Sequence, residues 1–143
     1  MSFIWYFFIL KQETRFMTII TSEELSKCRR SLQSYGQEAS EVIDIVEECQ
    51  GNLEEAMAIL MVNAGKEPVL GDDDWIDFEN IVKGLRSFIC DPDFKDFIVN
   101  DAFAMALGYL LAKTTHPATF LILVLLFIVR KGIKHFCGQE QVT

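Results

Sequence analysis

An unbroken apolar run near the carboxyl end constrains this chain more than any other feature. Every residue from Phe120 to Val129 is Phe, Leu, Ile or Val, and Arg130 and Lys131 close the run. As a helix, residues 118–129 would be about 18 Å long, against a hydrocarbon core of about 30 Å in a bilayer. The run is short for a membrane crossing and apolar on every side, so it needs cover from lipid or from protein.

A second apolar segment precedes this run and predicts a helical hairpin. The pattern predicts one helix over residues 93–113, whose second half, residues 102–112, is apolar all round. Residues 114–117 break the pattern, and Pro117 is well placed to start the next helix. We expect that next helix to continue to about Phe136 and to end at Gly138. The segments 102–112 and 118–129 would then pack as an antiparallel hairpin.

The sequence before the hairpin predicts an acidic linker followed by an amphipathic helix. Residues 67–74 form the linker and end in three aspartates. One of these caps the next helix and the others favour its positive end, which explains them better than a metal site does. The helix itself is expected over residues 75–90, with a broad apolar face.

How the hairpin is covered decides the class of protein. Only two or three helices are available in residues 75–143, so we expect part of the apolar helix over residues 118–129 to stay exposed and to favour lipid or a partner. Two alternatives stand: membrane association on the cytoplasmic side, and a soluble oligomer that uses the hairpin as core or interface. The residues expected at that membrane or interface are Leu110, Phe120, Leu123, Phe127, Arg130 and Lys131.

The first half of the chain predicts three short helices with tight turns. Ser22 caps a helix that runs to about Ser34, the second covers residues 40–49, and Asn52 caps a third over residues 53–63. Glycines 36, 51 and 65 follow the three helices in order. The expected fold class is therefore all-α: a small three-helix bundle, an amphipathic helix and a hydrophobic helical hairpin.

These helices carry a family resemblance. It is carried by Tyr35-Gly36, by Gly51-Asn52-Leu53-Glu54-Glu55-Ala56 and Ile59-Leu60, and by the spacing between these segments. The resemblance is to the ubiquitin-associated domain and the amino-terminal domain of elongation factor Ts. The resemblance covers residues 22–65. Ubiquitin-binding members place an exposed aromatic after the loop glycine, where this chain has Gln37. The resemblance thus implies a protein-contact module rather than one ligand, with Tyr35, Gly36, Gln37, Leu60 and Met61 as its contact residues.

The remaining residues limit the chemistry. The net charge of −8 excludes nucleic acid as a partner, because phosphates need a basic surface. The four cysteines are irregularly spaced without a Cys-x-x-Cys pair, so we expect free thiols in a reducing compartment. Two histidines without ligand spacing predict neither a metal nor a cofactor. Residues 2–10 are strongly apolar, and the segment 1–16 that contains them lacks a signal-peptide pattern. They represent an over-extended start before Met17 or an interfacial anchor.

We therefore predict a non-catalytic interaction module. The expected divisions are residues 1–16, a three-helix module at 17–66, the linker at 67–74 and the hydrophobic region at 75–143. An enzyme would need Cys137 beside His135, or Cys90 beside Asp91, and neither pair has a third orienting group in the sequence. A membrane assembly or remodelling factor is the other alternative. The expected partner is a protein, with homo-oligomers as a further option, in the cytoplasm or at the cytoplasmic face of a membrane.

Overall fold

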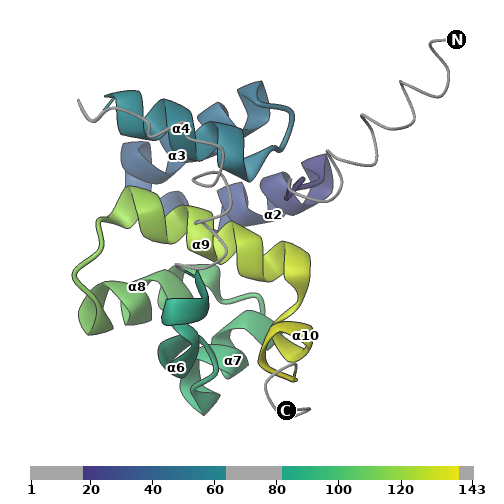
Figure 1. Ribbon diagram of the computed structural model, residues 1–143, viewed down its shortest axis with the longest axis vertical. Helices are drawn as coiled ribbons and strands as arrows, with labels where there is room; N and C mark the ends of the chain where they lie inside the picture. The colour runs from purple at the N-terminus through teal and green to yellow at the C-terminus, as the bar shows by residue number, and fades with distance from the viewer. Residues whose placement is uncertain (1–17, 64–81, 139–143) are drawn as a thin grey trace, which may run out of the picture.

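The apolar run forms the helix around which the other helices pack. A computed structural model describes residues 18–63 and 82–138, and Figure 1 shows α9 crossing the middle of the structure between α2–α4 and α8. The described residues are all-α, which confirms the expected fold class. Residues 82–84 are also helical. The helices are α2 (Ser22–Ser31), a 3-10 turn η1 (Gln33–Tyr35), α3 (Gly36–Glu48), α4 (Leu53–Asn63), α6 (Arg86–Ile89), α7 (Pro92–Val99), α8 (Phe103–Lys113), α9 (Ala118–Lys131) and α10 (Ile133–Gly138).

The first three helices form in the predicted order, but the bounds of the first two differ from the prediction. The first helix ends at Ser31 and is followed by η1, and α3 begins at Gly36, the residue expected to end the first helix, rather than at residue 40. The side-chain oxygen of Asn52 accepts a hydrogen bond of 3.0 Å from the backbone N–H of Glu55, which confirms the predicted cap of α4. The cap of α2 is Thr21 rather than Ser22, and Glu24 completes a capping box with it. Gly51 turns the chain into α4 with φ of +88°, and a Cβ there would strike the backbone of Ile20.

Two predicted long helices are each broken into two. The helix expected over residues 93–113 stops after Val99, because Asp101 takes a left-handed conformation with φ of +58°, and α8 begins at Phe103. Likewise, the helix expected from Pro117 to Phe136 ends at Lys131. Gly132, with φ of +93°, turns the chain there and α10 runs back over the end of α9. The first part of the helix expected over residues 75–90 lies outside the described residues. Its described part is interrupted at Leu85.

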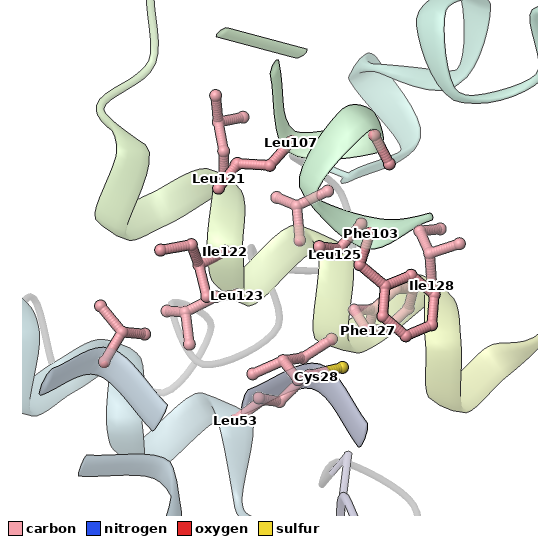
Figure 2. Packing of buried hydrophobic residues seen from close by; sticks show 14 of the residues in the cluster. Cys28, Leu53, Phe103, Leu107, Leu121, Ile122, Leu123, Leu125, Phe127 and Ile128 are labelled. Atoms are coloured by element: carbon pink, nitrogen blue, oxygen red, sulfur yellow. The ribbon is translucent and has the colours of Figure 1, made fainter. Parts of the chain in front are cut away.

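The expected hairpin forms, but its second helix has no open face. α8 and α9 run antiparallel on either side of the turn at residues 114–117 (Figure 1). All residues from Leu121 to Ile128 are buried, and α9 packs against α2, α3, α4, α8 and α10. Figure 2 shows Leu121 directed towards Leu107 of α8, while Leu123 lies on the side of α9 that faces Cys28 and Leu53. The expectation that part of this helix stays uncovered is therefore wrong.

Both halves of the chain contribute to one hydrophobic core. Buried residues from Ile20 to Phe136 form a single cluster, so the described three-helix segment packs directly on α9. Our expectation counted only the helices of residues 75–143 as cover and thus overlooked α2, α3 and α4. A hydrogen bond also links α2 to α8. The side chain of Ser31, at the end of α2, accepts this bond of 3.2 Å from the backbone N–H of Phe103, the first residue of α8. That bond satisfies an otherwise unpaired donor at the start of α8.

The cysteines also differ from expectation. A disulfide joins Cys90, the C-cap of α6, to Cys137 in α10, so the four thiols are not all free. Cys28 and Cys49 are free and buried. The bond closes 47 residues of chain, a separation that leaves no local pattern in the sequence. In the chain-entropy account, such a loop corresponds to about 4 kcal/mol of stabilisation through the unfolded state.

Candidate protein-contact surface

The residues expected at a membrane or interface lie largely inside the fold. Leu110, Leu123 and Phe127 are 0%, 1% and 3% exposed, because α9 and α8 pack on each other and on the first three helices. Phe120 is half-buried and its ring lies 5.0 Å from that of His116. These four side chains therefore do not form an open apolar surface. Among the described residues, no helix combines the length and the apolarity that a membrane crossing requires.

The two cations that close the apolar run contact the protein itself. The Arg130 guanidinium lies 3.7 Å from a carboxylate oxygen of Glu24 in α2. The Lys131 ammonium lies 5.9 Å from the centre of the Phe127 ring. Since both side chains are partly exposed, each of these contacts is worth little on its own. Their position is explained by the end of α9, where positive charge favours the helix C-terminus.

Tyr35 has an internal contact rather than a free surface. Its side chain is half-buried, and its hydroxyl donates a hydrogen bond of 3.2 Å to the carbonyl oxygen of Ala104 in α8. Gly36 and Gln37 are exposed, and the Gln37 amide donates a hydrogen bond of 3.0 Å to Glu41. Of the three loop residues expected to bind a partner, the structure leaves the second and third accessible.

A small groove opens beside this loop, between α2, η1 and α3. It has a volume of about 220 Å³, below the usual 300–1,000 Å³ of a small-molecule pocket. Arg29 bridges its two sides, with ion pairs of 2.9 Å to Asp44 and 3.4 Å to Glu47. The groove is large enough for an inserted side chain of a partner. Its lining comprises Arg29, Leu32, Gln33, Gly36, Ala39, Ser40 and Ile43.

The last turn of α4 presents an exposed apolar end. Ile59 and Val62 are 37% and 53% exposed, and they lie on one side of the helix because they are three residues apart. Leu60 and Met61, the two residues expected there from the sequence, are half-buried, and Leu60 packs against the core. We refer to Ile59, Leu60, Met61 and Val62 as the α4 end. Ile59 and Val62 were not predicted as contact residues, although α4 is apolar over almost its whole length and so had to expose some apolar side chains.

The two described segments of the chain carry opposite net charges. Residues 18–63 carry nine acidic and three basic side chains, a net charge of −6, whereas residues 82–138 carry four acidic and seven basic ones, a net charge of +3. The acidic side chains of α3 are exposed along the helix that packs beside α4. The apolar α4 end therefore belongs to the acidic part of the molecule.

The four cysteines are either paired in a disulfide or buried. Cys90 and Cys137, which any cysteine nucleophile near Asp91 or His135 would require, are joined to each other in this form. Burial raises the pKa of the Cys28 thiol to about 12, and burial together with Glu55 raises that of Cys49 to about 11. Both thiols are therefore neutral near pH 7 and poor nucleophiles. Within residues 18–63 and 82–138, no group of three His, Cys, Asp or Glu side chains lies close enough to hold a metal ion.

Comparison of the chain with protein-family models, curated proteins and solved structures finds no match. The resemblance of residues 22–65 to the ubiquitin-associated and elongation factor Ts domains thus stays a prediction from the sequence.

Proposed function

We propose that this chain is a non-catalytic protein-interaction module that binds its partner through the α4 end. The observation that carries the proposal is the exposure of Ile59 and Val62 on one side of a helix. The other large apolar side chains that are exposed among the described residues, Ile19, Val99 and Met105, lie on separate segments, whereas Ile59 and Val62 are neighbours on one helix. An exposed apolar patch with a charged surround is a common form of protein-contact site.

The partner that fits this surface has an apolar centre and a basic rim. The helices around the α4 end carry a net charge of −6, so a basic rim would speed encounter and fix orientation. The groove beside Gly36 would accept one side chain of the same partner. This division of roles follows the resemblance, in which the loop and the third helix act together.

The burial of the hairpin bears on which helix contacts the partner. A hairpin whose second helix is enclosed serves the fold as core, which favours contact through α4 over contact through α9. The proposed location is the cytoplasm, including the cytoplasmic face of a membrane.

Two matched substitutions test the proposal. Val62→Asp places a charge at the α4 end, and Val99→Asp places the same charge at the end of α7, where Val99 is 60% exposed. Both side chains are exposed, so both variants should unfold within a few degrees of the unchanged protein. We expect quantitative affinity capture from extracts of the source cells to lose a bound protein at least about tenfold with Val62→Asp only. Equal capture by both variants, or no specific partner for the unchanged chain, would contradict the proposal.

A further inference from the structure

The disulfide is accessible to reagents in solution, whereas the other two cysteines are not. Cys90 and Cys137 are both partly exposed, whereas Cys28 and Cys49 are buried. We propose that the Cys90–Cys137 pair is a reversible thiol–disulfide exchange site, and that its reduction releases α10 from α6. The proposal is independent of the partner that the α4 end binds.

The surroundings of the pair favour exchange. Arg86 lies one helical turn before Cys90, and its guanidinium sits 4.6 Å from the ring centre of Phe136, the neighbour of Cys137. Lys134 lies three residues before Cys137 in the exposed part of α10. Positive charge close to a sulfur would stabilise the thiolate that leaves when the bond is attacked, whereas the carboxylate of Asp91, next to Cys90, opposes that effect. An exposed disulfide is also more open to reduction than a buried one.

The reaction needs a dithiol reductant. Its first thiolate attacks one sulfur of the pair, which breaks the S–S bond, forms a mixed disulfide and releases the other cysteine as a thiolate. The second thiol of the reductant, as its thiolate, then attacks the mixed disulfide and releases the remaining cysteine. The reductant becomes a disulfide, two electrons pass to the cystine, and the protons of the two reductant thiols end on Cys90 and Cys137.

The other attachments of α10 explain why its release would be local. α10 has six residues, too few to be stable as an isolated helix. The attachments that remain after reduction include the buried side chains Ile133 and Phe136, the Arg86 guanidinium over the Phe136 ring, and a hydrogen bond of 2.7 Å from that guanidinium to the carbonyl oxygen of Phe136. The ring of Phe136 meets that of Phe127 edge to face, with centres 6.4 Å apart. Opening of α10 would therefore uncover Phe127 at the end of α9.

The experiment compares the air-oxidised full chain with the same chain reduced by dithiothreitol, both in native buffer. After reduction, N-ethylmaleimide should label Cys90 and Cys137 and leave Cys28 and Cys49 unlabelled, as mass spectrometry of the peptides would report. Amide hydrogen exchange over residues 133–138 should rise about tenfold, while exchange in α2 and α3 stays unchanged.

Two variants serve as controls. The double variant Cys90→Ser/Cys137→Ser should exchange like the reduced protein and give no response to dithiothreitol. Cys28→Ser should keep the full response. Four reactive thiols in the air-oxidised chain would overturn the proposal, as would unchanged exchange in α10 after reduction. Faster exchange throughout α2, α3 and α9 would also overturn it, because the bond would then be a general crosslink.

Discussion

The hydroxyl of Tyr35 donates a hydrogen bond of 3.2 Å to the carbonyl oxygen of Ala104, across 69 residues of chain. This bond joins η1 to α8, and Gly108 lies beside it, where a Cβ would come within 3.1 Å of the same hydroxyl oxygen. The loop aromatic of the three-helix segment thus adds a hydrogen bond to the hydrophobic packing that joins the two halves of the described fold. Its position explains why an expected contact residue is not free to meet a partner.

Removal of the hydroxyl should weaken this junction. Tyr35→Phe deletes one neutral hydrogen bond, so the free energy of unfolding should fall by about 0.5–1.5 kcal/mol. Urea unfolding followed by circular dichroism measures the change. Ser34→Ala, at an exposed position of the same turn, is the control and should change stability by less than about 0.5 kcal/mol. A loss for Tyr35→Phe no larger than that of the control would show that the bond does not form in solution.

Gly108 and Tyr35 should be energetically coupled. Alanine is a better helix former than glycine by about 0.8–1.0 kcal/mol, but in the unchanged protein its Cβ would press on the Tyr35 hydroxyl. We expect Gly108→Ala to stabilise the Tyr35→Phe background more than the unchanged one, by at least about 0.5 kcal/mol in a double-mutant cycle. Gly84→Ala is the control, since a Cβ there meets nothing within 4 Å, and its effect should be the same in both backgrounds. Additive effects at Gly108 would mean that the two residues are not in contact.

Truncation within α9 should cost far more than truncation on the surface. Leu123 is 1% exposed, so Leu123→Ala should lower the free energy of unfolding by about 2–5 kcal/mol. Met105 in α8 is 60% exposed, and Met105→Ala should change it by no more than about 0.5 kcal/mol. Denaturant titrations of both variants in detergent-free buffer provide the comparison. Similar small losses would place Leu123 outside the core.

The buried thiol of Cys28 predicts a dependence of stability on alkaline pH. Burial raises the pKa of this thiol from 9.0 to about 12. Between pH 9 and 12 the folded chain keeps a proton on Cys28 that the unfolded chain gives up, so the free energy of unfolding must fall as the pH rises through this window. Below pH 9 both states are protonated and the thiol adds no dependence.

Cys28→Ala should remove that contribution. The variant should be less stable than the unchanged protein at pH 7 because a cavity forms, and the difference should narrow between pH 9 and 11. Unfolding at a series of pH values measures both curves. Parallel curves over this range would show that the folded thiol titrates like an unfolded one.

The sequence determines the helices better than their breaks. The Asn52 cap of α4 and the start of α9 after Pro117 both appear in the structure where the sequence pattern places them. The break at Asp101 has no such signal, because a left-handed aspartate depends on its surroundings. Gly132 did carry a signal, a glycine after two cations, and the apolar residues beyond it masked the end of α9.

Packing between distant segments was harder to foresee. The apolar run indicates that α9 must be covered on every side, but no local sequence pattern indicates that α2, α3 and α4 cover it. The same holds for the disulfide between Cys90 and Cys137 and for the bond from Tyr35 to α8, which join residues far apart in the chain. For the candidate site, the expected Leu60 and Met61 lie at the α4 end, but which neighbours are most exposed depends on how α4 rests on the core.

The central claim is that α9 is enclosed by helices from both halves of its own chain. Methyl nuclear Overhauser measurements on the full chain in detergent-free buffer test it most directly, with Leu123 as the probe, because Figure 2 places it on the side of α9 that faces Cys28 and Leu53. We expect contacts from the Leu123 methyl groups to side chains of α2 or α4 in a monodisperse sample. Absence of those contacts, or contacts that appear only with the acyl chains of added lipid, would contradict the claim.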